Sequence, residues 1–122
     1  MDKPDRHEKI YDLINLEEIS GGSNEFIEQM ILLFLDQAEN TMKGMKQALD
    51  TGNIREIRNL AHQLKPSVDN IRVEELGKTI RQVEDLAENR PNSSDLPHQV
   101  SLAMEQLAEL VGQLKRDFSS LL

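Results

Sequence analysis

The chain of 122 residues contains no cysteine, and aromatic residues make up only 3% of it. Without cysteine it cannot form a disulfide, a thiolate nucleophile or a zinc–thiolate site. The apolar residues are instead mostly Leu, Ile, Val and Met. Because β-sheets are enriched in aromatic and β-branched residues, this composition favours helices packed on helices.

Basic residues are also fewer than acidic ones. The chain has 14 Lys and Arg against 22 Asp and Glu, which leaves a net charge of -8. Nucleic acids and anionic lipid surfaces both attract proteins through basic residues, so we expect neither nucleic acid nor membrane as a partner. No apolar run approaches the length of a membrane span, and the polar N-terminus lacks the apolar centre of a signal peptide. We therefore expect a cytoplasmic protein.

Four long segments carry a regular signal, because their apolar residues recur at spacings of three and four, the period of an amphipathic helix. The four stripes are Ile27, Ile31, Phe34, Ala38, Met42, Met45 and Leu49; Ile57, Ala61, Leu64, Val68 and Ile71; Val73, Leu76, Ile80, Val83 and Ala87; and Val100, Met104, Leu107, Val111, Leu114, Phe118 and Leu121. The pattern predicts an all-α fold, an antiparallel up-down four-helix bundle with a short N-terminal segment packed on it.

A chain of this length forms one domain. We predict a flexible tail over residues 1–10 and one helical domain over residues 11–122, and we expect a monomer. Residues 11–16 are expected to be extended, and residues 17–20 to form a single helical turn before Gly21-Gly22 breaks the chain.

The second stripe has a clear start and an unusual interior. Asn53, with Glu56 three residues later, predicts a capped helix start. Pro66 lies inside the stripe, where it removes the N–H that would bond to the carbonyl of His62. Because Val68 and Ile71 stay in phase beyond it, we predict a kink at Pro66 rather than the end of the helix.

His62 is the strongest candidate for chemistry. It lies about 100° from the core-facing Ala61 on the helix, and Lys65 follows three residues later. An imidazole there can accept and return a phosphoryl group, and a cation one turn away would stabilise the phosphoryl anion. Periodicity alone favours a simpler interpretation, a partly exposed surface histidine without a role.

Other chemistries find less support in the sequence. His7, His62 and His98 are far apart, and no Glu-x-x-His pair is present, so we expect no metal site. Ser67 lies five residues from His62, on a different face of the helix, which argues against a hydrolytic pair. Gly21-Gly22 lacks the lysine of a phosphate-binding loop, so we expect no nucleotide site and no cofactor.

A second apolar stripe of Phe26, Met30 and Leu33 runs beside the first one on the same predicted helix. Two interpretations are open. The apolar residues of segment 13–19 can cover this stripe, or part of it can stay exposed as a docking surface for another protein.

The motif Ala61-His62-Gln63-Leu64-Lys65 resembles the signature of the histidine-containing phosphotransfer (HPt) domain, which reads roughly Ala-His-x-Leu-Lys-Gly with a second glycine six residues later. Further similarities are found in Leu16-Glu17-Glu18-Ile19-Ser20-Gly21-Gly22, Phe26-Ile27, Phe34-Leu35, Ala48-Leu49, Gly52-Asn53 and Gln82-Val83-Glu84. The resemblance extends over roughly residues 11–118. It departs from the signature at Pro66 and Arg72, which replace the two glycines.

The resemblance implies a phosphocarrier rather than an enzyme. A receiver-domain aspartyl phosphate would pass its phosphoryl group to His62, and a second receiver domain would take it on. By the same analogy Lys65 stabilises the phosphoryl group and Glu84 orients the imidazole. The partners would be response-regulator receiver domains, a hybrid histidine kinase, or both, and the receiver would supply the magnesium ion.

The second apolar stripe, together with Ile19 upstream, indicates where such a partner would dock around His62. The candidate docking residues are Ile19, Phe26, Met30, Leu33, Pro66 and Asp69. The alternative function is a non-catalytic helical adaptor that docks receiver domains without being phosphorylated. Arg72 gives this alternative some weight, because it places a cation and a residue with a Cβ where the family has glycine.

Overall fold

The computed structural model describes residues 10–122, and within them every regular element is a helix. The elements are α1 (Ile14–Ser20), α2 (Asn24–Thr51), α3 (Ile54–Asn70), α4 (Glu74–Asn89), α5 (Asp95–Asp117) and the 3₁₀ turn η2 (Ser119–Leu121). No strand occurs in this part of the chain. The predicted all-α class is therefore confirmed.

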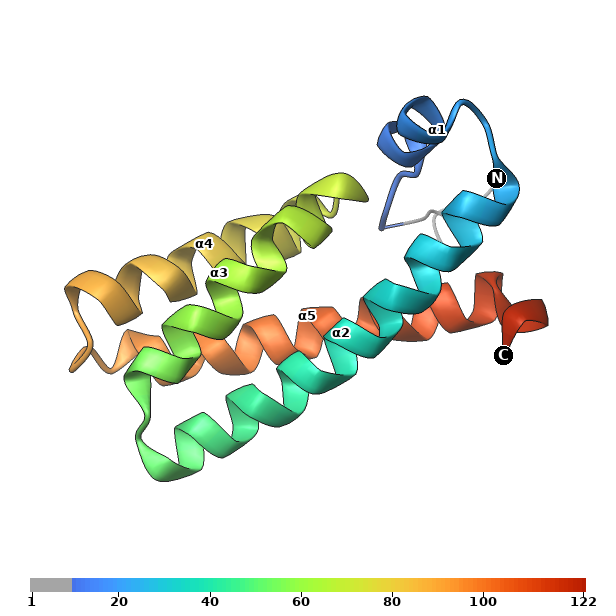
Figure 1. Ribbon diagram of the computed structural model, residues 1–122. Helices are drawn as coiled ribbons and strands as arrows, with labels where there is room; N and C mark the ends of the chain where they lie inside the picture. The colour runs from blue at the N-terminus through green and yellow to red at the C-terminus, as the bar shows by residue number, and fades with distance from the viewer. Residues whose placement is uncertain (1–9) are drawn as a thin grey trace, which may run out of the picture.

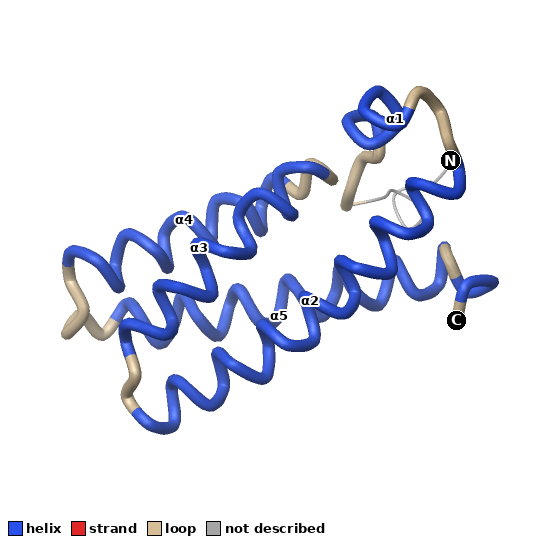
Figure 2. Tube along the Cα trace, in the orientation of Figure 1, coloured by secondary structure: helices blue, strands red, loops and turns tan. Residues whose placement is uncertain are grey.

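Each of the four long helices packs against the next one along the chain, and α5 packs back against α2 (Figure 1). α1 lies at one end of this assembly, beside the end of α3 and next to the start of α2. The connections from α2 to α3 and from α3 to α4 are short (Figure 2). None of the helices between residues 10 and 122 is both long and apolar enough to cross a membrane.

The four predicted stripes meet in one core, although the inward face of α5 is rotated from the predicted one. Its buried residues are Leu96, Val100, Ala103, Leu107, Leu110 and Leu114, whereas Met104, Val111 and Phe118 are only partly buried. The reason is that α5 packs against both α2 and α4. A helix with two neighbours buries a stripe wider than the simple three-four repeat selects.

Local capping explains where the helices on either side of the α2–α3 turn end and begin. Gly52 adopts a left-handed conformation with φ of 69° at the end of α2. The side chain of Asn53 then accepts a hydrogen bond from the backbone N–H of Glu56 at 3.1 Å, so the predicted cap is confirmed. α3 continues through Pro66 to Asn70, which agrees with the prediction that proline does not end this helix.

The N-terminal segment differs from the sequence-based prediction. α1 begins at Ile14, whereas we predicted an extended chain up to residue 16. The Asp12 carboxylate accepts the N–H of Ile14 at 2.9 Å and so starts the helix early. The N–H of Asp12 also donates to the carbonyl of Ile71 at 2.8 Å, which fixes α1 against the end of α3. Of the predicted tail, residues 1–9 lie outside the described residues, and the N–H of Ile10 donates to the side chain of Gln113 at 2.8 Å.

Three helices end with the same pair of backbone hydrogen bonds. In this arrangement, the Schellman motif, the residue after the helix end is left-handed and two N–H groups bond back to the last turn. Gly21 and Gly52 occupy the left-handed position after α1 and α2, and Arg72 occupies it after α3 with φ of 51°. A Cβ is disfavoured in this conformation. The left-handed backbone at Arg72 therefore accounts for the glycine that the HPt signature has there.

We expect Arg72→Gly to leave the free energy of unfolding unchanged or raise it by about 0.5 kcal/mol, because relief of backbone strain outweighs the added freedom of the unfolded chain. The guanidinium of Arg72 lies 4.0 Å from the Asp12 carboxylate. Both side chains are exposed, so loss of that ion pair lowers the free energy of unfolding only slightly. Denaturant melts measure the difference.

Gly52→Arg is the matched control, since it introduces arginine at the equivalent position of α2. A Cβ at Gly52 meets no atom within 4 Å, so only backbone strain changes there. We expect Gly52→Arg to lower the free energy of unfolding by about 1 kcal/mol. If Arg72→Gly instead lost more than about 1 kcal/mol, Arg72 would have a structural role that its contacts do not reveal.

Candidate functional site

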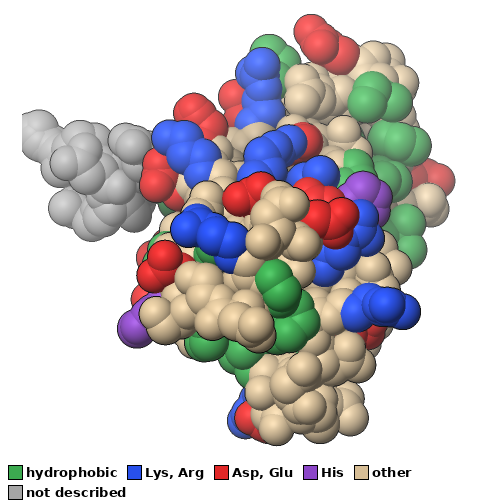
Figure 3. Space-filling view, turned by 90° about the vertical axis from the view of Figure 1, so that its left-hand side faces the viewer, with side chains coloured by type: hydrophobic (Ala, Val, Ile, Leu, Met, Phe, Trp, Pro, Cys, Tyr) green, Lys and Arg blue, Asp and Glu red, His purple; other side chains and the backbone are tan. Residues whose placement is uncertain are grey.

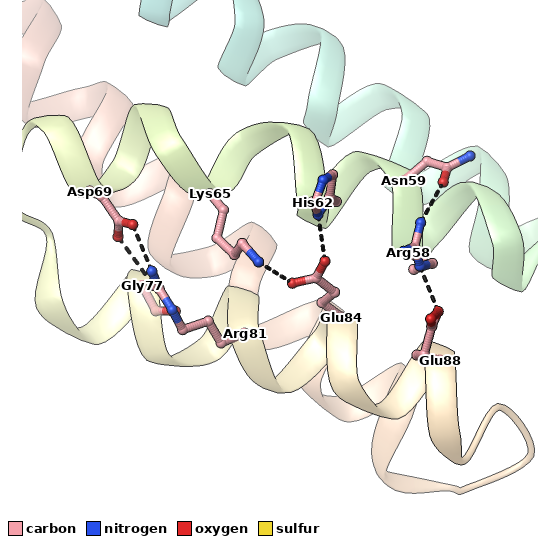
Figure 4. Close-up of polar contacts among 9 residues, drawn as sticks. All are labelled: Arg58, Asn59, His62, Lys65, Asp69, Gly77, Arg81, Glu84 and Glu88. Atoms are coloured by element: carbon pink, nitrogen blue, oxygen red, sulfur yellow. Dashed lines mark hydrogen bonds and ion pairs between the residues drawn. The ribbon is translucent and has the colours of Figure 1, made fainter.

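A row of polar side chains joins α3 to α4 (Figure 4). The residues of this α3–α4 polar row are Arg58, His62, Lys65 and Asp69 on α3, and Arg81, Glu84 and Glu88 on α4. Their spacings of three and four place each set on one side of its helix. The polar row therefore follows from helical periodicity once α3 and α4 lie side by side.

Glu84 is the centre of the polar row. One of its oxygens lies 2.6 Å from Nδ1 of His62, and the other lies 2.6 Å from Nζ of Lys65. The Glu84 side chain is only 18% exposed, whereas His62 is 58% exposed and Lys65 is 28% exposed. A single, largely covered carboxylate thus holds both an exposed imidazole and the neighbouring ammonium group.

The contact with Glu84 determines which ring nitrogen of His62 is available. A carboxylate can only accept a hydrogen bond, so Nδ1 carries the proton in this pair. The neutral ring then has its lone pair on Nε2. Within residues 10–122, Nε2 has no hydrogen-bond partner. This arrangement presents Nε2 as a nucleophile toward solvent.

Glu84 is kept ionised by its two partners. The hydrogen bond from Lys65 lowers the pKa of the Glu84 carboxyl from its usual 4.5, and the bond to His62 adds to this effect against the opposing effect of burial. Because Glu84 stays charged, it can balance positive charge on the ring of His62.

Two further ion pairs flank this centre and hold α3 and α4 in register. Arg81 donates two hydrogen bonds to Asp69, at 3.1 and 2.6 Å, and this contact raises the pKa of the Arg81 guanidinium. On the other side, Arg58 contacts Glu88 at 2.6 Å. The guanidinium of Arg81 also lies over Gly77, where a Cβ would come within 3.3 Å of it. Gly77 therefore leaves space for the arginine that crosses between the helices.

Gln37 of α2 contacts the opposite side of the histidine helix, and the sequence did not reveal it. Its Nε2 donates to the carbonyl of Gln63 at 3.3 Å, and its Oε1 accepts from the hydroxyl of Ser67 at 2.7 Å. These contacts lie on either side of Pro66, where α3 lacks a backbone N–H. A single glutamine on a helix flank carries no pattern, so only the packing of α2 on α3 identifies it.

The candidate docking residues fall into two groups. Ile19 and Leu33 are 65% and 62% exposed, and Phe26 is exposed to a smaller degree, whereas Met30 is partly buried and packs on the core. Leu16 is buried, so α1 covers only part of the second stripe of α2. Part of that stripe is thus covered and part is exposed, and its use as a docking surface stays a prediction.

A small hollow lies between α1, α2 and the end of α3. Its lining residues are Leu16, Met30, Leu33, Phe34, Gln37, Ser67, Asn70 and Ile71. Figure 3 shows a histidine side chain between a column of hydrophobic side chains and a mixed group of acidic and basic ones.

The two remaining candidate docking residues lie on α3. Pro66 is exposed, and Asp69 is hydrogen-bonded to Arg81.

Metal ligands do not gather among the described residues: no three His, Asp or Glu side chains between residues 10 and 122 could hold one ion. His98 is exposed in the first turn of α5, far along the chain from His62, and His7 lies outside the described residues. Of the candidate catalytic residues, the structure brings together His62, Lys65 and Glu84.

Comparison with known proteins shows the family and the fold of this chain. A sequence model of the Hpt domain matches residues 29–117. The crystal structure of histidine-containing phosphotransfer protein B (HptB) from Pseudomonas aeruginosa PAO1 is similar in fold, with a TM-score of 0.74, 20% sequence identity, and coverage of 93% of this chain and 91% of that one. No curated protein sequence matches. The match over most of the chain shows that it belongs to the Hpt domain family, the phosphotransfer modules of phosphorelays.

Proposed function

We propose that the chain accepts a phosphoryl group from a receiver-domain aspartate on Nε2 of His62 and passes it to another receiver domain. The observation that carries this proposal is the shared carboxylate of Glu84, which holds Nδ1 of His62 and Nζ of Lys65 at 2.6 Å each. It leaves Nε2 exposed next to a cation. In the same proposal, α2–α5 are the four helices of an HPt bundle with α1 as its packed N-terminal segment.

The transfer can be followed atom by atom. The lone pair of Nε2 attacks phosphorus as the bond from phosphorus to the receiver's aspartate oxygen breaks, so the aspartate leaves as a carboxylate. His62 keeps the proton on Nδ1 and gains positive charge, which the Glu84 carboxylate balances. The second transfer reverses these steps. The protein therefore contributes position and charge, as expected for phosphoryl transfer.

Lys65 has two candidate partners during this cycle. In the unphosphorylated protein its ammonium group pairs with Glu84. Once Nε2 carries phosphate, the flexible side chain can turn toward the phosphoryl oxygens while Glu84 retains His62. The exchange replaces one charge-assisted hydrogen bond by another, so it costs little free energy.

The partner domain supplies the rest of the proposed site. A receiver domain would hold the magnesium ion, and its apolar surface would cover Ile19, Phe26 and Leu33. Pro66 leaves the approach to His62 open, because its ring is shorter than most side chains. A hybrid histidine kinase that carries a receiver domain would dock in the same way, in the cytoplasm.

His62 is expected to be the sole phosphoacceptor. We expect His62→Gln to abolish labelling by a phosphorylated receiver domain while the helical circular dichroism stays unchanged, since this exposed side chain contributes little to the core. His98→Gln is the matched control and should keep full labelling. Label retained on His62→Gln would refute the assignment, and an unlabelled parent protein that still binds receivers would favour the adaptor function.

Lys65 should affect the rate more than the fold. We expect Lys65→Ala to slow single-turnover transfer by about tenfold, which corresponds to about 1.4 kcal/mol in the barrier. Stability should fall by less than about 1 kcal/mol, because one partly exposed hydrogen bond is lost. Lys65→Arg should restore part of the rate, and Lys43→Ala, which removes an exposed lysine on α2, should change neither quantity. Equal rates in Lys65→Ala and the parent would exclude the electrostatic role.

Glu84 should stabilise the fold in a pH-dependent way. Its pKa is lowered on folding, so its contribution is complete above the usual 4.5 and is lost as the pH falls through the lower folded value. We expect Glu84→Gln to lose about 1–2 kcal/mol at pH 7. The difference in the free energy of unfolding between variant and parent should then disappear in denaturant melts at pH values well below 4.5.

Glu88→Gln provides the comparison for Glu84, because Glu88 is 52% exposed and pairs with Arg58 alone among residues 10–122. Glu88→Gln should lower the free energy of unfolding by less than about 0.5 kcal/mol. A stability gap for Glu84→Gln that stays constant between neutral and acid pH would contradict the proposed charge pairing.

A further inference from the structure

The charges of this chain are unevenly distributed. Residues 10–42 contain no Lys, Arg or His, but they contain seven acidic residues, Asp12, Glu17, Glu18, Glu25, Glu28, Asp36 and Glu39. This segment therefore carries -7 of the net charge of -8. It forms α1 and the first half of α2, the same elements that expose Ile19, Phe26 and Leu33.

The acidic side chains border the exposed apolar ones directly. Glu18 precedes Ile19 on α1, and Asp36 lies one helical turn beyond Leu33 on α2. Glu18 and Asp36 are exposed, and neither forms an ion pair with any basic residue between positions 10 and 122. Within residues 10–122, the negative charge on this border is therefore not neutralised by an ion pair.

The apolar surface formed by Ile19, Phe26 and Leu33 has uncharged residues of α3 along its opposite border. Across the hollow, α3 presents the uncharged residues Ser67 and Asn70, with Pro66 beside them. The α3–α4 polar row follows, and its three Arg and Lys residues are matched by three Asp and Glu residues. The charge therefore changes from acidic at Glu18 and Asp36, on one border of the apolar surface, to balanced in the α3–α4 polar row on the other.

From this asymmetry we infer that the partner is a receiver domain whose docking surface has an apolar centre and Lys or Arg residues along the edge that meets α1 and the first half of α2. This inference rests on the proposed phosphotransfer function. A basic edge would be attracted to the acidic border before contact, which raises the rate of encounter and turns the partner so that its aspartate faces His62.

Charge also argues against other occupants of this surface. A second copy of the chain would bring its own uncompensated acidic residues against these, and like charges at an interface oppose association. A receiver with an acidic edge would be rejected in the same way. The acidic border thus selects among partners as well as accelerating the correct one.

Two double variants with the same net charge test the inference. Glu18→Gln with Asp36→Asn removes two charges from the acidic border, and Glu105→Gln with Glu109→Gln removes two exposed charges from α5, which does not line the hollow. Each protein is phosphorylated chemically with phosphoramidate, a small donor that needs no docking surface. Transfer from each to a panel of purified receiver domains is then followed at low salt and at about 1 M NaCl, where the screening length is about 3 Å.

We expect kcat/KM for the fastest receiver to fall about three- to tenfold in the border variant at low salt and to stay near the parent value in the α5 variant. The difference should disappear at high salt, while phosphoramidate labels all three proteins equally. Equal loss in both variants, or no loss in either, would overturn the inference although transfer still occurs. Absence of transfer from the phosphorylated parent to every receiver would instead count against the proposed function.

Discussion

The carboxylate of Glu84 is the group on which the candidate site depends. It reaches His62 with one oxygen and Lys65 with the other, so the proton on the ring, the direction of Nε2 and the position of the cation are all set by one side chain. Glu84 comes from α4, whereas both of its partners come from α3. The site consequently exists only when the two helices are packed in one register, and the pairs Asp69–Arg81 and Arg58–Glu88 maintain that register on either side.

This arrangement also explains why an almost neutral polar row suits a phosphoryl carrier. A phosphoryl group brings negative charge, and a site crowded with unpaired cations would bind it too tightly to release it. Here the ammonium of Lys65 is already paired, so in the proposed function the gain on phosphorylation would be the difference between two similar hydrogen bonds. A small difference of this kind would favour transfer in both directions, as the proposed exchange between two receiver domains requires.

Much of this structure was predictable from sequence, and the limits have physical causes. Helical periodicity predicted the all-α class and the continuation of α3 through Pro66, and the spacing of Asn53 and Glu56 predicted its capped start. The spacing of His62 and Lys65 predicted that they share one helix face, and the resemblance to the HPt domain pointed to Glu84. Periodicity could not reveal Gln37, whose contacts with Gln63 and Ser67 exist only across two helices. It also could not reveal the early start of α1, where the Asp12 carboxylate accepts the N–H of Ile14. Tertiary contacts of single polar residues leave no repeat in a sequence.

The short turn between α3 and α4 has a consequence for how the chain can vary. Only residues 71–73 separate the two helices, and Arg72 holds them in a left-handed bend. One inserted residue would turn α4 by about 100° relative to α3, which would carry Glu84 away from His62 and separate every pair of the polar row. Residues 90–94, between α4 and α5, face no such restriction, because α5 contributes nothing to the row. Changes of length among functional relatives should therefore collect in that distal loop, while the turn at Arg72 keeps its length whatever residue occupies it.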